Sequence, residues 1–376
     1  MRTDCITTKS SRNARSERDV DPQMLRGLEA KLRELFPGAR IVKARPLADD
    51  NSQSATKAHG YGRPMRITIE SCGQLHELVF HTLRADDFGH DRRADRLAGA
   101  MLSFDTFGRI PRHVKALDIG AIDRDGNLVS LAHSGEPYFI TAWAPGHSYA
   151  DDLHELAKRD SATALDLTRV DALADLLVEI HAAPGSHPEA YARAIRDLLG
   201  SGEGIFGLID SYAVDTPGAP PSRLQRIEHA CLDWRWRLKP RVDRLRRTHG
   251  DFHPFNILFD DAAAVTLLDA SRGAEGDPAD DVACLAINFL FFGLRAPHKQ
   301  GFAQLWTRFW ERYQAASSLE VLSAVAPFFA WRGLVLASPR WYPDVTVAQR
   351  EAIFDFVERA LAAERFEPAW GLELLR

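Results

Sequence analysis

The chain has 376 residues, of which 45% are apolar and 26% are charged, and its formal net charge is −5. This length is sufficient for two domains or lobes with a substantial core, and the composition is that of an ordinary soluble protein. Nothing in the overall charge argues for binding to nucleic acid or to an anionic membrane.

The first twenty residues are polar and lack the apolar segment of a secretory signal, so we interpret residues 1–21 as a disordered tail. An amphipathic helix is predicted next, because Asp21 suits the N-cap, Pro22 suits the first helical position and leucines recur at helical spacing. Pro37 and Gly38 end this helix.

Short strand-like segments dominate the following hundred residues. They occupy residues 41–46, 65–70, 77–83, 116–122 and 138–142. Residues 123–127 predict a hairpin turn. Between the third and fourth strands, residues 91–102 predict a helix with a buried apolar face, formed by Leu97, Ala98, Met101 and Leu102.

The rest of the chain is mostly helical in its apolar periodicity. Helices are predicted at residues 170–181, 222–247 with a break at Pro240, 282–294, 302–313, 319–336 and 347–363. The most apolar run, residues 282–294, is shorter than the roughly twenty residues of a membrane span, so we interpret it as a buried helix.

The four cysteines, Cys5, Cys72, Cys231 and Cys284, are far apart in the sequence. Without a Cys-x-x-Cys pair they exclude the usual zinc spacings, and they offer no disulfide framework, which favours a reducing cytoplasm.

The most informative stretch is residues 248–271. A polar loop with His249, Asp251 and Asn256 leads into an apolar strand, and a second strand returns to end at Asp269. This pattern predicts a hairpin with three polar side chains gathered at its mouths. Phosphoryl transfer requires a carboxylate to accept a proton and oxygen ligands for magnesium, and Asp251, Asn256 and Asp269 supply both.

Two other interpretations of the loop are open. Asp251 and Asn256 could form a turn and a cap, since both residue types bond readily to nearby backbone. His249, Asp251 and His253 could instead be a zinc triplet of a hydrolase, although no second His or Cys cluster completes such a site.

The His-x-Asp-x-x-x-x-Asn pattern followed by a strand-borne Asp resembles the aminoglycoside phosphotransferase and choline kinase-like family. The resemblance implies that Asp251 is the catalytic base, that Asn256 and Asp269 hold Mg²⁺, and that His249 supports the loop. It also implies that Asp281, in the Gly-Asp-Pro segment that follows, braces the catalytic loop from behind.

The resemblance further implies an α+β, bilobal, protein-kinase-like fold. Residues 22–142 would form a small antiparallel N-lobe with helices, and residues 143–376 a larger helical C-lobe, with nucleotide and metal between them. In this family the third strand carries a phosphate-binding lysine, but here it carries His81. We expect His81 to pair with Asp95, with Lys57 or Arg84 as other cations within reach.

The segment at residues 138–146 is similar to the family's hinge. By that resemblance the backbone of Ala142, Trp143 and Ala144 would bind the adenine. The loop at residues 49–63 stands where a nucleotide-covering loop belongs, but it lacks a Gly-x-Gly-x-x-Gly motif.

The function we predict is ATP- or GTP-dependent phosphorylation of a hydroxyl on a small molecule by a cytoplasmic monomer or weak homodimer. A nucleotide-binding pseudokinase, motivated by His81, is the main alternative, and a protein kinase and a metal hydrolase are others. The acceptor stays open among aminoglycosides, sugars, choline-like alcohols and amino-alcohols. Acids that could meet an aminoglycoside are Glu275, Asp277 and Asp280.

Overall fold

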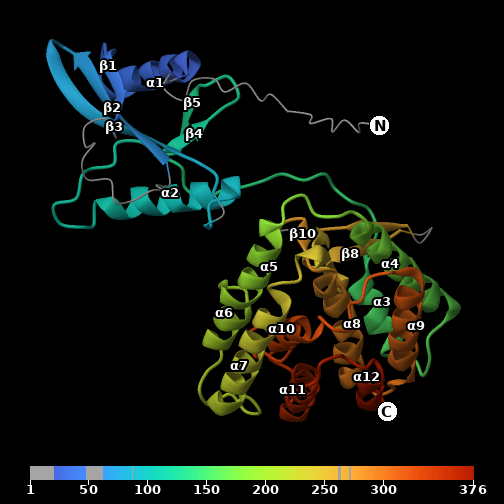
Figure 1. The fold of residues 1–376 in the computed structure, drawn as a ribbon. Helices are drawn as coiled ribbons and strands as arrows, with labels where there is room; N and C mark the ends of the chain where they lie inside the picture. The colour runs from blue at the N-terminus through green and yellow to red at the C-terminus, as the bar shows by residue number, and fades with distance from the viewer. Residues whose placement is uncertain (1–20, 48–61, 87, 261–263, 271) are drawn as a thin grey trace, which may run out of the picture. The chain divides into compact units, whose positions relative to one another are not determined.

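A computed structural model of the protein describes residues 21–47, 62–86, 88–260, 264–270 and 272–376. The chain divides into two compact units, Met1–Ile140 and Thr141–Arg376 (Figure 1). The predicted tail lies outside the described residues except for Asp21. The predicted nucleotide-covering loop, with Lys57, also lies outside them except for residues 62–63. The predicted lobe boundary after residue 142 stays a prediction.

The first unit is built on an antiparallel sheet of three strands in the order β1-β2-β3. These strands are β1 Arg40–Pro46, β2 Gly62–Ser71 and β3 Gln74–Leu83. Every second side chain of β2 is buried, at Met65, Ile67 and Ile69, and these pack with Leu28 and Leu32 of helix α1 Pro22–Leu35. The Asp21 side chain accepts a hydrogen bond from the Gln23 N–H at 2.9 Å, as predicted for the N-cap.

A second hairpin in this unit joins β4 Gly120–Ile122 to β5 Leu128–Ser130. The Asp123 carboxylate closes its turn by accepting the backbone N–H groups of Asp125 at 2.9 Å and Asn127 at 2.8 Å. The predicted turn is therefore confirmed, although β4 begins four residues later than the predicted strand at 116.

Two predictions for the first unit are wrong. Helix α2 Arg93–Phe107 forms, but none of its residues is buried, and Leu97 and Leu102 are 38% and 64% exposed. The sheet already buries its apolar face against α1, which leaves α2 outside that core. The predicted strand at residues 138–142 is absent, because no hydrogen bond among the described residues pairs this segment with another strand.

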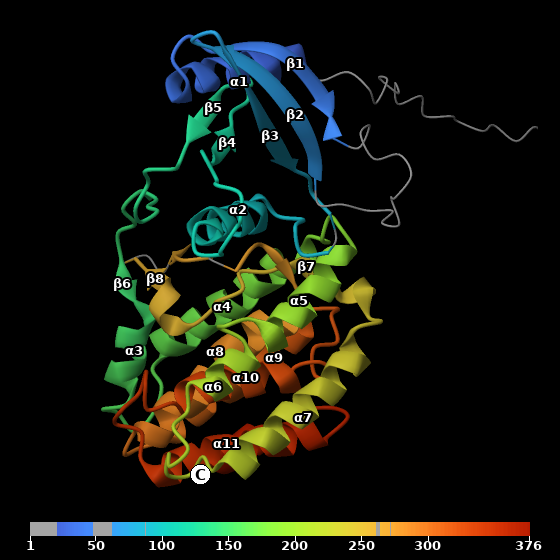
Figure 2. The ribbon, with the colours of Figure 1, turned by 90° about the vertical axis from the view of Figure 1, so that its left-hand side faces the viewer.

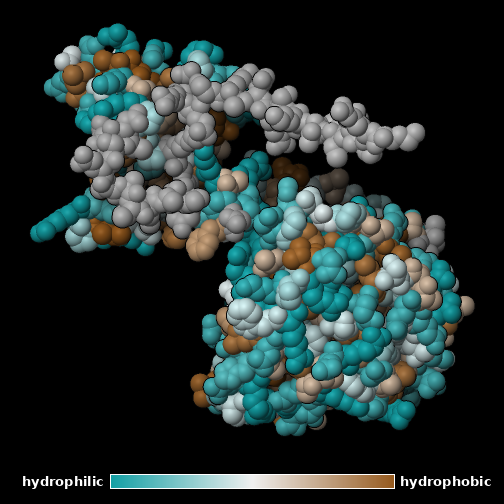
Figure 3. Space-filling model, in the orientation of Figure 1, coloured by the Kyte–Doolittle hydropathy of each residue, from teal (hydrophilic) through white to brown (hydrophobic). Residues whose placement is uncertain are grey.

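The second unit is a helical assembly around α8 Pro278–Arg295, whose side chains are almost all buried. Helices α4 Ala164–Ala182, α9 Gln300–Ala316 and α10 Ala326–Leu336 pack around it (Figure 2). The remaining helices are α3 Tyr149–Leu156, α5 Glu189–Gly200, α6 Ile205–Asp210, α7 Pro221–Leu238, α11 Val347–Ala362 and α12 Ala369–Leu374. With these apolar side chains inside, the visible face of this unit is mainly hydrophilic (Figure 3).

Each helix predicted for this unit overlaps an observed helix, whereas α3, α5, α6 and α12 were not predicted. Helix α7 ends before Pro240, as predicted, but the predicted helical part after this break is replaced by the 3-10 turn Val242–Arg244 and the strand β7 Arg246–Arg247. Two helices differ clearly in length from the prediction. Helix α10 begins at Ala326 and not at residue 319, and α4 begins at Ala164 and not at residue 170. Pro327 lies in the first turn of α10, where proline is tolerated. In the interior of a helix that began at residue 319, the proline ring would clash with the preceding turn and its missing N–H would leave a carbonyl unpaired. In the part of the chain that the structure describes, no helix is long and apolar enough to cross a membrane.

Candidate functional site

The predicted catalytic loop runs from β7 Arg246–Arg247 through the short 3-10 turn Pro254–Asn256 into a hairpin. The hairpin strands are β8 Ile257–Phe259 and β9 Val265–Leu267, antiparallel as predicted. Beyond β9, the Leu268 N–H donates to the Asn256 carbonyl at 2.8 Å. Asn256 and Asp269 therefore lie at the same open end of the hairpin.

Asp281, in the first turn of α8, anchors the start of this loop. Its fully buried carboxylate accepts the backbone N–H groups of His249 and Gly250, both at 2.8 Å, and contacts Nε2 of His181 at 3.1 Å. Gly250 has a φ of +82°, which favours glycine. The position of Asp281 behind the loop is the one that the family resemblance implies.

The Asp251 carboxylate is surrounded by donors. Its Oδ1 lies 2.7 Å from a guanidinium nitrogen of Arg332 and 2.7 Å from one of Arg272, while Nε2 of His253 lies 3.5 Å from its Oδ2. Burial alone would raise the pKa of Asp251, but the His253 hydrogen bond and the two arginine charges lower it below its ordinary value. The carboxylate is thus ionised at neutral pH and available as a proton acceptor.

Asn256 is oriented by Asp251. Its amide nitrogen donates to the backbone carbonyl of Asp251 at 3.1 Å and to Oδ2 of the same residue at 3.3 Å. No hydrogen bond among the described residues uses the amide oxygen of Asn256. An amide oxygen held in this way is a suitable ligand for a hard divalent cation.

Asp269 follows the last hairpin strand with a φ of +51°, in the left-handed region that few residues other than glycine adopt. Its side chain is exposed and makes no ion pair within the described residues. Strained backbone of this kind persists at sites where the surrounding structure imposes it. A free carboxylate therefore stands at the hairpin end that also holds Asn256.

The alternative zinc triplet is not formed. The Nδ1 atoms of His249 and His253 accept backbone N–H groups, from Asp251 at 3.3 Å and Phe255 at 3.2 Å. Within the described ranges, no three His, Cys, Asp or Glu side chains gather into a metal-binding group. The interpretation of Asp251 as a simple turn residue does not fit either, because its carboxylate contacts the side chains of Arg332 and Arg272 and not the nearby backbone.

The expected partners His81 and Asp95 do not meet. His81 is exposed on β3 and has no ion pair among the described residues. The Asp95 carboxylate instead accepts the Arg92 N–H at 3.1 Å and so caps α2. The N-terminus of α2 therefore takes up the carboxylate that was expected to pair with His81. The spacing of residues in the sequence does not reveal this capping role.

The three acids suggested for a cationic acceptor are engaged inside the second unit. Glu275 accepts from the N–H and hydroxyl of Ser186 at 2.7 and 2.6 Å. Asp277 is buried and forms a two-point ion pair with Arg244, both contacts at 2.7 Å. Asp280 lies 2.6 Å from Arg332. An aminoglycoside site made of these acids is thus not supported.

The sequence pattern does not predict the two arginines, Arg332 and Arg272, that contact Asp251. Arg332 is the one charged residue of α10, an otherwise apolar helix. A single charge within such a run is a signal for a buried ion pair, since arginine is rarely buried without a partner.

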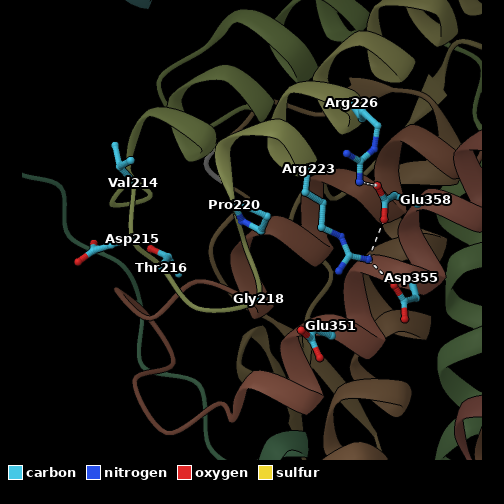
Figure 4. A pocket seen from close by; sticks show the side chains of 10 residues that line it. All are labelled: Val214, Asp215, Thr216, Gly218, Pro220, Arg223, Arg226, Glu351, Asp355 and Glu358. Carbon is cyan, nitrogen blue, oxygen red and sulfur yellow. Dashed lines mark hydrogen bonds and ion pairs between the residues drawn. The ribbon is translucent and has the colours of Figure 1, made fainter.

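A cavity of about 720 Å³ lies elsewhere in the second unit, beside α7 and α11 (Figure 4). Its lining includes Arg223, which contacts Glu358 at 2.7 Å and also pairs with Asp355. None of the catalytic-loop residues lines it. This cavity is separate from the candidate site.

Comparison with known proteins places this geometry in context. A family model described as a phosphotransferase enzyme family matches residues 109–316, more than half of the chain. No curated protein matches the chain.

Several solved structures are similar over 90% of this chain. A choline kinase from Streptococcus pneumoniae is 14% identical, with 99% of its own chain covered and a TM-score of 0.34. A thermostable aminoglycoside phosphotransferase, solved with ADP and hygromycin B, is 15% identical, with 99% covered and a TM-score of 0.38. A microcompartment-associated aminopropanol kinase is 14% identical, with 98% covered and a TM-score of 0.41. Identities and TM-scores this low do not decide a function.

Proposed function

This chain belongs to the phosphotransferase enzyme family, and from that premise we propose that it transfers the γ-phosphate of ATP or GTP to a hydroxyl group of a small molecule. One observation carries the proposal. The carboxylate of Asp251 contacts the amide of Asn256, which shares the hairpin end with the exposed carboxylate of Asp269.

In this proposal Asp251 accepts a hydrogen bond from the attacking hydroxyl and takes its proton as the new O–P bond forms and the bond to the departing ADP or GDP breaks. A carboxylate with a lowered pKa is a weak base. Its main contribution is then to orient the hydroxyl, with proton transfer late, as suits the loose transition state of phosphoryl transfer.

Asn256 and Asp269 would hold Mg²⁺. The residues fit this ion, because the amide oxygen of Asn256, which has no hydrogen-bond partner among the described residues, and an exposed carboxylate stand at one hairpin end, and both groups offer oxygen ligands. When bound, Mg²⁺ neutralises the charge of the phosphate oxygens.

Nucleotide contacts by His81, Asp95 and the backbone of Ala142, Trp143 and Ala144 belong to the proposal as well. So does the protein-kinase-like arrangement of lobes at 22–142 and 143–376. The antiparallel sheet of the first unit and the helices of the second are the elements that such a fold requires. A cytoplasmic location and a monomeric or weakly dimeric state stay predictions.

A nucleotide-binding pseudokinase is the second candidate function. The observation that favours it is His81, which stands in place of the expected lysine and has no ion pair with Asp95. A neutral imidazole is a weaker phosphate clamp than an ammonium group.

Both candidates can be separated by one experiment. ADP or GDP release is measured with the Mg²⁺ nucleotide and a panel of aminoglycosides, sugars, choline-like alcohols and amino-alcohols, beside the thermal shift caused by nucleotide alone. Release that depends on one acceptor class supports the phosphotransferase. A thermal shift without release under any acceptor supports the pseudokinase.

A further inference from the structure

We propose that Arg332 is a positioning residue that, together with Arg272, holds one oxygen of Asp251 so that the other oxygen receives the acceptor hydroxyl. This inference rests on the proposed phosphotransferase function. It adds a residue from α10, distant in sequence from the loop, and it assigns the reacting atom of Asp251.

The contacts of Arg332 define its role. One guanidinium nitrogen donates to Oδ1 of Asp251 at 2.7 Å, and the other donates to the Gly250 carbonyl at 2.9 Å and to Asp280 at 2.6 Å. The planar fork therefore binds the backbone before Asp251 and the Asp251 side chain at once, which a single point charge cannot do.

The Arg332 fork is itself held in place. Its side chain is only 7% exposed, and its guanidinium carbon lies 4.0 Å from the centre of the Trp331 ring. The Arg272 guanidinium lies 4.7 Å from the same ring centre, and the indole N–H donates to the Glu203 carbonyl at 2.6 Å. One fixed aromatic ring thus orients both cations that converge on Asp251.

The two oxygens of Asp251 are consequently unequal. Oδ1 accepts a hydrogen bond from Arg332 at 2.7 Å and forms an ion pair with Arg272 at 2.7 Å, so two cations already crowd this oxygen. Oδ2 has only the longer contacts with Asn256 at 3.3 Å and His253 at 3.5 Å. The geometry leaves Oδ2 as the oxygen that can accept a hydroxyl proton.

Arg350, in the same unit, provides a matched control that separates a positioning role of Arg332 from a purely structural one. Arg350 of α11 is 4% exposed and bonds to backbone carbonyls, of Ala337 at 2.7 Å, Pro217 at 2.7 Å and Val345 at 3.3 Å. Within the described structure, Arg350 makes no hydrogen bond or ion pair with Asp251, Asn256 or Asp269. Its loss removes a buried arginine without touching the proposed base.

The test compares Arg332→Gln, Arg332→Lys and Arg350→Gln with the wild-type protein. Turnover is measured as ADP release with the acceptor found by the panel, and each rate is divided by the folded fraction from chemical unfolding. Arg332→Gln is expected to lose about 10²-fold in kcat, the effect of a misplaced reacting group, with KM for ATP nearly unchanged. Arg332→Lys is expected to lose about tenfold, because it restores the charge but not the fork.

The outcomes are distinct. Arg350→Gln is expected to keep the wild-type kcat per folded molecule. A wild-type kcat for Arg332→Gln would overturn the positioning role alone, as would parallel losses of kcat in Arg332→Gln and Arg350→Gln. Absence of turnover by the wild-type protein with every acceptor would overturn the proposed function and this inference together.

Discussion

Replacement of Asp281 by alanine tests how the candidate site depends on α8. The carboxylate accepts the N–H groups of His249 and Gly250 at 2.8 Å each and contacts His181 at 3.1 Å, and it is completely buried. In Asp281→Ala these donors lose their acceptor and stay inside the protein.

A buried donor without a partner costs about 1–3 kcal/mol. Two backbone donors and one imidazole then predict a loss of roughly 3–9 kcal/mol in the free energy of unfolding. Domains are stable by only about 5–15 kcal/mol, so the second unit is expected to unfold at a markedly lower denaturant concentration. Asp281→Asn keeps one acceptor oxygen and is expected to lose less.

Urea unfolding followed by tryptophan fluorescence measures this change, since Trp234, Trp306 and Trp310 lie in the core of the same unit. Asp233 is an exposed acid on α7 and provides the control, because Asp233→Ala removes a charge without a buried contact. The reasoning is refuted if Asp281→Ala and Asp233→Ala unfold at the same urea concentration.

Three further predictions follow from buried charges and from the proposed metal ligands. Arg244→Met leaves the buried Asp277 carboxylate without its ion pair and is expected to lower the free energy of unfolding by about 3–5 kcal/mol. The control Arg308→Ala breaks an exposed ion pair with Asp171 and is expected to leave the urea midpoint unchanged. Equal urea midpoints for the two variants would contradict this prediction. Burial and the neighbouring Asp281 raise the pKa of Asp280 from 3.8 to about 6 against the opposing charge of Arg332, so this residue contributes stability at low pH that is lost as the pH rises through about 6. Asp280→Asn, whose side chain does not titrate, should therefore gain stability relative to wild type as the pH rises from about 4 to 7. A difference in stability that does not change with pH would contradict this sign. Asp269→Asn is expected to raise the Mg²⁺ concentration for half-maximal turnover by at least about tenfold, and an unchanged Mg²⁺ dependence would exclude it as a ligand.

The elements that could be predicted from the sequence are those specified by neighbouring residues. Asp21 and Pro22 mark the start of α1, and the alternation along β2 marks its buried face. The hairpin after Asn256 was predicted because its polar loop, apolar strands and turn are adjacent in the chain.

The errors arose where distant segments decide the outcome. Helix α2 has helical spacing, but the sequence does not show that the sheet is covered by α1. The strand expected at residues 138–142 has strand-like composition but no pairing partner in the described structure. Composition reports what a segment can become, whereas its neighbours decide whether its apolar side chains are buried.

The candidate site shows the same division. The pattern from His249 to Asp269 is local and was recognisable, whereas the contact of Arg332 with Asp251 joins residues 81 positions apart. Glu275, Asp277 and Asp280 were read as possible substrate contacts, but their partners Ser186, Arg244 and Arg332 come from other segments.

The most direct test of the central claim is turnover and nucleotide binding of Asp251→Asn beside the wild-type protein, with Mg²⁺ and the acceptor from the panel. Asparagine keeps the shape of the side chain but cannot take a proton, so kcat is expected to fall by about 10²- to 10⁴-fold while the nucleotide still binds. A variant that turns over at the wild-type rate would show that Asp251 is not the base.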